Sequence, residues 1–401
     1  MNAPTRALLA WLALGATALA LAGCGGGGGS SSTSVAPATP SVPLDANQLA
    51  VSVEQEPNIT SYITANTPYA SVTVCDSLGN CSTVNHVLVD TGSYGLRLFA
   101  SALGSNVQLT PMVSTTAGTL GQPIGECAGF ISNSVWGPVR MATVKLGAMQ
   151  TSQIPVQILA DPNFPTATTA AGGSSVCPNA TASSTEQQFG AKGVLGIGLL
   201  TNDGQQYYAC TASSCTSVAP PQQVSNPVAA LPSDNNGVIL SMPAVSTVQN
   251  SVAGVLTFGV DTESNNQLTG YTVLPATSSG YVTVTMNGTN YARSFIDSGS
   301  NANFLVLPGV STDSNGFYAP AQFTTYPATV SGGGTSYATS VSVEASSSQP
   351  LGVAVYPYLA APSGSSNSQD FGLPYFYGKS IAYAIHGSVT LHGTGPFYAI
   401  H

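Results

Sequence analysis

Apolar and polar residues alternate along most of the chain after about residue 45. The alternation is clearest at Ser71–Cys75, Val135–Leu146, Gly254–Val260 and Tyr281–Met286. A period of two places successive side chains on opposite faces of a strand, as in a sheet with one buried face. The sequence has no long stretch with the helical period. We therefore predict a mainly β protein.

A tight hairpin turn is expected at Asn287-Gly288. This dipeptide separates Val282–Met286 from Tyr291–Ile296, and both flanking runs have the strand pattern. Asn-Gly tolerates the positive φ angles that a two-residue hairpin turn requires, and it is the strongest short-range hairpin signal. The two runs should therefore pair as adjacent antiparallel strands.

One short motif occurs twice in the chain. Val87-Leu-Val-Asp-Thr-Gly-Ser93 returns as Ser294-Phe-Ile-Asp-Ser-Gly-Ser300, and each copy ends a β-rich run. From the Ser and Thr content, we expect about 0.07 chance occurrences of Asp-[Ser/Thr]-Gly-[Ser/Thr]. Two copies therefore indicate a distant internal duplication that supplies one carboxylate per copy.

The two carboxylates, Asp90 and Asp297, suit acid–base chemistry. Each is followed by a small hydroxyl residue and a glycine, which let the chain turn sharply and direct backbone N–H groups at the carboxylate. Two such strand ends facing each other would share one proton. One carboxyl group can then accept a proton from water while the other donates one to a carbonyl oxygen. The supporting loop residues are Thr91, Gly92, Ser93, Ser298, Gly299 and Ser300.

At these residues the sequence resembles the pepsin-like aspartic peptidases. The resemblance covers most of residues 45–401, and it implies a bilobal β fold, a peptide or protein substrate, and no metal or cofactor. Gly193–Gly198 and, more loosely, Asp370–Pro374 resemble the apolar-apolar-Gly segments that pack behind the catalytic loops. Gly254–Asp261 is similar to the strand that closes the first lobe. We place the lobes at residues 45–262 and 263–401.

The resemblance extends to a flap that closes over substrate. Glu126–Gly147 is placed like this hairpin, and we expect its turn near Ser132, Asn133 and Ser134. Phe130 occupies the place of the flap tyrosine, and Arg97 stands where pepsins often have Trp. These departures remove the hydrogen-bonded pair that positions the flap in pepsins. Arg97 would also lower the first pKa of the carboxylate pair if its guanidinium approached the dyad.

The first residues have the layout of a cleaved secretion signal. Arg6 precedes an apolar run from Ala7 to Ala22, which is too short to span a membrane stably. Leu21-Ala-Gly-Cys24 resembles the bacterial lipobox, in which the Cys is lipidated and becomes the first mature residue. We expect a signal peptide at residues 1–23, a lipidated Cys24, and a flexible Gly- and Ser-rich tether to residue 44.

With the lipobox, the chain also resembles an uncharacterised family of Gram-negative lipoproteins of this fold. Gly25 follows Cys24, which by resemblance to sorting signals favours the outer membrane. The expected location is therefore extracytoplasmic, with membrane contact through the N-terminal lipid only. The alternative is an ordinary signal peptide with a chance Cys.

Six cysteines remain if Cys24 carries lipid, and an oxidising compartment favours disulfides. Cys75 and Cys81 flank a short turn between two β-rich runs, and Cys210 and Cys215 can close another short loop. Elimination leaves Cys127 and Cys177 for each other, although six cysteines allow 15 pairings. The sequence has neither a C-x-x-C motif nor metal-ligand spacing of its histidines.

The charge content excludes nucleic acid as a partner. The chain has 7 Lys and Arg against 16 Asp and Glu, and the basic residues are scattered singly. A nucleic-acid site needs clustered cations to displace phosphate counterions. With 43% hydrophobic residues the chain can still build a core, and we expect a monomer.

Other functions remain possible for the same residues. A catalytically silent pepsin-like binding or scaffold lipoprotein would keep the fold and both aspartates. Isolated Asp-Ser-Gly segments are most often local turns capped by their own Asp. Glycoside hydrolysis also uses two carboxylates, but only two Trp are available as sugar platforms. The chain has no G-x-S-x-G, so a serine hydrolase has little support.

Overall fold

The computed structural model describes residues 43–56, 64–130, 134–168, 175–177, 185–202, 204–348 and 352–401. Within these ranges the chain is mainly β, as predicted. Its helices are short: α1 (Glu186–Phe189), α2 (Leu373–Phe376), and the 3-10 turns η2 (Ala100–Ala102), η5 (Pro227–Ala230) and η6 (Ser346–Ser348). No helix in the described ranges is both long and apolar enough to cross a membrane. Cys24 and the expected signal peptide lie outside these ranges.

A large sheet contains strands from both halves of the chain. Its strands are β1 (Gln48–Glu54), β2 (Pro68–Cys75), β3 (Cys81–Asp90), β4 (Tyr94–Phe99), β5 (Thr110–Pro111), β6 (Ile124–Gly129), β7 (Ser134–Leu146), β8 (Met149–Leu159), β9 (Gly193–Ile197), β10 (Gln206–Cys210), β11 (Cys215–Ser217), β12 (Gly237–Met242), β13 (Ser251–Phe258), β14 (Thr272–Pro275), β22 (Lys379–Ala384) and β25 (Phe397–Ile400). Their order is β11-β10-β6-β7-β8-β4-β9-β3-β2-β1-β13-β12-β22-β25-β14, and β5 pairs with β7.

A smaller sheet belongs to the second half of the chain. Its strands are β15 (Val282–Met286), β16 (Thr289–Ile296), β17 (Asn303–Leu305), β18 (Thr324–Gly332), β19 (Thr335–Val343), β20 (Ala360–Pro362) and β21 (Asp370–Phe371). Their order is β19-β18-β15-β16-β21-β17-β20. A separate two-stranded ribbon is formed by β23 (Val389–Thr390) and β24 (Gly393–Thr394).

The predicted hairpin at Asn287-Gly288 joins β15 and β16. Met286 pairs with Thr289, and the two turn residues have φ angles of 51° and 74°. Alternate residues of β15 are buried, as the period-two pattern predicts. The short-range signal and the burial pattern therefore fix the same register.

The internal duplication is visible in the topology. In the first half, β9 runs parallel to β3 and antiparallel to β4, and β4 runs parallel to β8. In the second half, β21 runs parallel to β16 and antiparallel to β17, and β17 runs parallel to β20. The repeated unit therefore has four strands, and each copy of the Asp motif follows the first strand of its unit.

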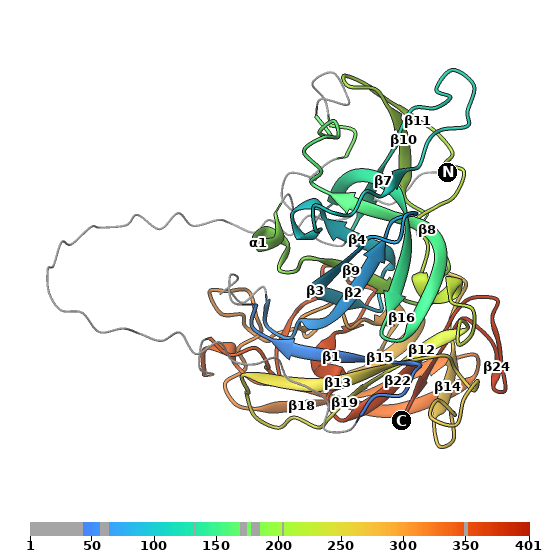
Figure 1. Ribbon diagram of the computed structural model, residues 1–401. Coiled ribbons are helices and arrows are strands. Elements are labelled where there is room, and N and C mark those ends of the chain that lie inside the picture. Colours follow the sequence, from blue (N-terminus) through green and yellow to red (C-terminus); the bar gives the residue numbers. More distant parts are fainter. Residues whose placement is uncertain are drawn as a thin grey trace, which may run out of the picture.

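A shared layer joins the two halves. Strands β1, β13 and β12 from the first half continue into β22, β25 and β14 from the second half, as Figure 1 shows in its lower part. The inward side chains of this layer are fully buried, among them Val51, Leu240, Leu256 and Ile381. The layer is a common base, so it holds the two motif-bearing units in a fixed relation.

The three predicted disulfides are confirmed. Cys75–Cys81 closes the turn between β2 and β3, and Cys210–Cys215 closes the turn between β10 and β11. Cys127–Cys177 links β6 to a segment 50 residues later. Two bridges are therefore local, and one fixes a long connection.

Candidate active site

The two Asp-containing loops lie directly against each other. Asp90 is the last residue of β3, and Asp297 follows the last residue of β16. A Cβ atom on Gly92 would lie 2.4 Å from Cγ of Asp297, and one on Gly299 would lie 2.6 Å from Oδ1 of Asp90. Only glycine permits so close an approach, so each loop needs its glycine to bring its backbone against the opposite carboxyl group.

Reciprocal hydrogen bonds fix the two loops. The Ser298 N–H donates to Oγ1 of Thr91 at 2.9 Å, and the Thr91 N–H donates to Oγ of Ser298 at 3.2 Å. The Ser298 hydroxyl donates in turn to the Val89 carbonyl at 2.7 Å. Thr91 and Ser298 are both buried, so these hydroxyls satisfy backbone groups that water does not reach. The second motif residue of each copy therefore aligns the loops rather than the substrate.

Asp90 is surrounded by hydrogen-bond donors from its own loop. Its Oδ1 accepts the N–H groups of Gly92 at 2.8 Å and Ser93 at 3.1 Å, and its Oδ2 accepts the Ser93 hydroxyl. Donors of this kind stabilise the ionised form of a carboxyl group. These bonds fix the orientation of the Asp90 carboxyl group within its loop.

Asp297 is prepared to hold a proton. Its Oδ1 accepts the Gly299 N–H at 2.7 Å, and its Oδ2 accepts the Ser300 hydroxyl at 3.1 Å. Burial, the charges of Asp90 and Asp370, and a hydrogen-bond contact with Asp90 raise the pKa of Asp297 well above its usual range. Two carboxyl groups in contact cannot both ionise cheaply, so the pair shares one proton.

Two site residues were missed by the sequence analysis. Tyr94 directly follows the first motif, and burial together with the charges of Asp90 and Asp297 raises the pKa of its phenol. Asp370 contacts Ser300, with 2.6 Å between its Oδ2 and the serine Oγ. We expected the segment from Asp370 to pack behind the second loop, which it does, but assigned its carboxyl group no role. A detectable signal was its charge at a position where the first copy has the apolar Val194.

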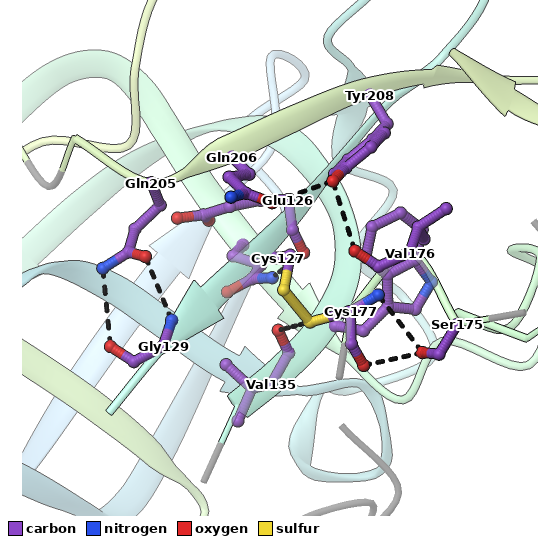
Figure 2. Close-up of a disulfide and its surroundings, with 12 residues drawn as sticks. Glu126, Cys127, Gly129, Val135, Ser175, Val176, Cys177, Gln205, Gln206 and Tyr208 are labelled. Carbon is purple, nitrogen blue, oxygen red and sulfur yellow. Dashed lines mark hydrogen bonds between the residues drawn. A yellow bond between two sulfur atoms is a disulfide. The ribbon is translucent and has the colours of Figure 1, made fainter. Parts of the chain in front are cut away.

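The flap-like hairpin consists of β6 and β7, which pair from Gly125↔Pro138 to Gly129↔Ser134. Ser132 and Asn133 lie outside the described residues, and Ser134 is the first residue of β7. The hairpin is braced from one side, because β10 pairs with β6 and the Gln205 side chain bonds both backbone groups of Gly129. Figure 2 shows this brace beside the Cys127–Cys177 disulfide. Strand β6 of the hairpin is therefore held along its length up to Gly129, the last residue before the turn.

The two departures from the pepsin pattern contact each other. The Arg97 guanidinium carbon lies 6.0 Å from the centroid of the Phe130 ring. The same guanidinium donates to Glu126 Oε1 at 2.7 Å and to the Tyr94 carbonyl at 2.7 Å. Both ionic side chains are almost fully buried. A buried ion pair and a cation–π contact thus join β4, the strand that follows the Asp90 loop, to the flap-like hairpin.

The described residues contain no group of three or more His, Cys, Asp or Glu side chains placed to hold a metal ion. The groups that meet at the dyad are carboxyls, hydroxyls and backbone N–H groups. These groups can accept and donate protons, so the arrangement is suited to acid–base chemistry.

Comparison with known proteins agrees with this architecture. The crystal structure of an aspartic proteinase from Irpex lacteus superposes with a TM-score of 0.53 and 16% sequence identity, covering 88% of this chain and 96% of that one. At this identity the likeness shows the fold, which is the mainly β, pepsin-like fold expected from the motif pair. A search of curated proteins found no match. The family model described as Protein of unknown function (DUF3443) matches residues 43–400, and the chain therefore belongs to this family.

Proposed function

We propose that the protein is an aspartic endopeptidase that uses Asp90 and Asp297 to activate water for peptide-bond hydrolysis. The observation that carries the proposal is the approach of the two loops, in which each glycine lies against the opposite carboxyl group. The fold supports it, because the pepsin-like architecture presents one such loop from each half of the chain.

In this proposal the two carboxyl groups have different tasks. Asp90, which accepts three hydrogen bonds within its own loop, removes a proton from water as the water oxygen attacks the peptide carbonyl carbon. Asp297 donates its proton to the carbonyl oxygen, which gives a neutral tetrahedral diol. The proton on Asp90 then passes to the amide nitrogen as the C–N bond breaks, and Asp297 recovers a proton from the diol. No covalent intermediate with the enzyme is formed.

The site is open to an extended chain on its loop side. Gly92 is exposed, and Ser93, Gly299 and Ser300 are half-buried, whereas both carboxyl groups are buried beneath them. A buried dyad below an accessible edge excludes bulk water from the reacting atoms while a substrate backbone lies across the loops.

We propose an extracytoplasmic location, with attachment to the outer membrane through a lipid on Cys24. The three disulfides support the compartment, because such bonds persist in oxidising environments. Mass spectrometry of the mature N-terminus tests the anchor. A diacylglycerol-modified Cys24 supports it, and an unmodified start at another residue removes it.

Cleavage of an unfolded protein substrate between about pH 3 and pH 7 tests the activity, with fragments identified by mass spectrometry. The wild type should cleave, a transition-state analogue of aspartic peptidases should inhibit, and Asp90→Asn should be inactive while it keeps its fold. A wild type that cleaves nothing would favour the alternative function, a silent pepsin-like binding or scaffold protein. The contacts that hold β6 of the flap hairpin up to Gly129 are compatible with either function.

A further inference from the structure

Ser300 contacts two carboxyl groups at once. Its Oγ lies 3.1 Å from Oδ2 of Asp297 and 2.6 Å from Oδ2 of Asp370. A serine hydroxyl has one hydrogen, so it can donate to only one of these oxygens. A second proton lets both contacts be full hydrogen bonds, whereas a single hydroxyl hydrogen can serve the second oxygen only as the weak arm of a three-centre bond. The geometry therefore favours one of the two carboxyl groups being protonated toward Ser300.

The surroundings of Asp370 decide which group that is. Asp370 is 4% exposed, and its Oδ1 is buried with no hydrogen-bond partner among the described residues. An ionised carboxylate with a single donor and no cation would be very costly at such a position, whereas a neutral acid leaves only a carbonyl-like oxygen unpaired. The favoured arrangement has Oδ2–H of Asp370 donating to Ser300, and Ser300 donating to Asp297.

Among the described residues, the titratable groups that interact with Asp370 include no cation. They are Asp90 and Asp297 on the two loops, and the phenols of Tyr383 on β22 and Tyr398 on β25. Burial raises the pKa of Asp370 well above its usual range, and the charge of Asp90 raises it further, against the lowering effect of the Ser300 hydroxyl. The electrostatic surroundings therefore agree with the proton count.

The two units of the duplicated fold differ at the position of Asp370. Asp370 pairs with Phe295 two residues before Asp297, and Val194 pairs with Leu88 two residues before Asp90. The first unit therefore fills the equivalent position with an apolar side chain. Of the two units, only the one that contains Asp297 has a carboxyl group at this position.

We propose that Asp370 is a positioning residue of the dyad, a permanently neutral acid that orients the Ser300 hydroxyl toward Asp297 and adds no negative charge to the one that the dyad carries. The three carboxyl groups then hold two protons between them. The catalytic meaning of this arrangement rests on the proposed function, but the proton count does not.

Infrared difference spectroscopy at pH 7 tests the proton count directly. The wild type minus Asp370→Asn spectrum should contain the C=O band of a protonated carboxylic acid that shifts on transfer to heavy water. A difference spectrum that contains only carboxylate bands would overturn the proposal, because Asp370 would then be ionised.

Thermal unfolding provides a second measurement that needs no activity. A group whose folded pKa is raised keeps its proton when the unfolded chain has lost it, so its stabilising effect is lost as the pH rises above about 4. Asp370→Asn has no carboxyl group at this position, so it does not lose stability in this way. The difference in Tm, variant minus wild type, should therefore increase by on the order of 5 °C from pH 4 to pH 7. An unchanged or falling difference would contradict a neutral Asp370.

Asp76→Asn is the matched control. Asp76 accepts hydrogen bonds from Asn80, Leu78 and Gln108 at a surface turn, and the Asn80 side chain is the main cause of its lowered pKa. The same chemical change should therefore give the opposite slope, with Tm relative to wild type falling as the pH rises. If both variants gave the same slope, the effect would not report the protonation of Asp370.

Measurements of kcat distinguish the positioning role of Asp370 from the proposed peptidase activity. Asp370→Asn can still donate an N–H to Ser300, whereas Asp370→Val, which copies Val194, cannot. We expect kcat to fall about tenfold in Asp370→Val and less in Asp370→Asn. Equal losses in both variants would remove the positioning role. A protein with the acid band and no turnover would refute the peptidase and leave the proton count intact.

Discussion

At the residue scale, glycine sets the distance between the two carboxyl groups. Gly92 and Gly299 each lie against the aspartate of the other loop, and any Cβ there would collide with a carboxyl group. The small hydroxyl residues then lock the two loops together through the Thr91 and Ser298 bonds. In the Asp-[Thr/Ser]-Gly-Ser motif, the Asp supplies the carboxyl group, and the hydroxyl residue and the glycine allow the two loops to approach each other.

Gly92→Ala tests this requirement. The added methyl group would lie 2.4 Å from Cγ of Asp297, so the loops must separate. A displacement of about 1 Å can cost 100-fold in rate, and we expect a loss of at least that size in kcat/KM with a modest change in Tm. Gly118→Ala is the control for the backbone cost of losing a glycine: its φ of 86° should make the variant less stable, but nothing lies within 4 Å of a Cβ there, so kcat/KM should not change. A fully active Gly92→Ala would show that the dyad does not need this approach.

At the element scale, the flap hairpin is held by contacts that pair residues far apart in the chain. Arg97 on β4 binds Glu126 on β6, and the Cys127–Cys177 disulfide and β10 hold the same hairpin from its other side. A pepsin-like flap tyrosine is replaced by Phe130, whose ring meets the Arg97 guanidinium. The chain thus connects β4, the strand that follows the Asp90 loop, to the flap hairpin with a buried ion pair.

A double-mutant cycle tests that connection. Arg97→Met and Glu126→Leu each leave one buried charge without its partner, so each should lower the free energy of unfolding by about 3–5 kcal/mol. The double variant should cost much less than the sum of the two. Arg140→Met is the control, because the Arg140–Asp161 pair is partly exposed and should contribute roughly 1 kcal/mol or less. Additive losses in the cycle would show that the two side chains do not act as a pair.

The long disulfide should stabilise the fold more than a short one. In the chain-entropy model, closing a 50-residue loop contributes about 4 kcal/mol and closing a loop of 5 residues about 2 kcal/mol. Urea unfolding of Cys127→Ala/Cys177→Ala and Cys210→Ala/Cys215→Ala compares the two bonds. Equal losses would mean that the long connection is already ordered without its bridge.

Local patterns in the sequence predicted most of the elements that carry the site. Some elements depend on residues that are neighbours in the sequence, so the sequence alone can predict them. They are the Asn287-Gly288 turn, the hairpin at Glu126–Gly147 and the glycine segment at Gly193. The pairing of β10 with the flap and the Arg97–Glu126 bond could not be predicted, because they depend on how distant strands pack. The contact of Asp370 with Ser300 could not be predicted for the same reason, although the charge at the position equivalent to Val194 was a detectable signal.

At the scale of the whole molecule, two similar units stand on a shared layer of strands. The two motif copies in the sequence predicted this duplication, and the strand orders β8-β4-β9-β3 and β20-β17-β21-β16 show it. Few ion pairs can stabilise the fold, because the chain has only 7 Lys and Arg. Its stability therefore depends mainly on burial and hydrogen bonds, which are insensitive to mild acid.

This composition predicts resistance to acid. Burial raises the pKa values of Asp297 and Asp370, so their effect favours the folded state near pH 4 and is lost as the pH rises. Asp76, with its lowered pKa, acts in the opposite direction. We expect Tm at pH 4 to equal or exceed Tm at pH 7, as measured by calorimetry in matched ionic strength. A steep loss of Tm on acidification would show that ion pairs dominate the stability.

The central claim is that Asp90 and Asp297 act as one catalytic unit. The most direct test is kcat/KM for one peptide substrate, measured for wild type, Asp90→Asn, Asp297→Asn and the double variant at the pH optimum. Because neither carboxyl group can serve alone as both acid and base, each single change should lower kcat/KM by roughly 1,000-fold or more, and the double change should cost little beyond that. Single variants that keep substantial activity, or losses that add in the double variant, would contradict the shared-proton mechanism.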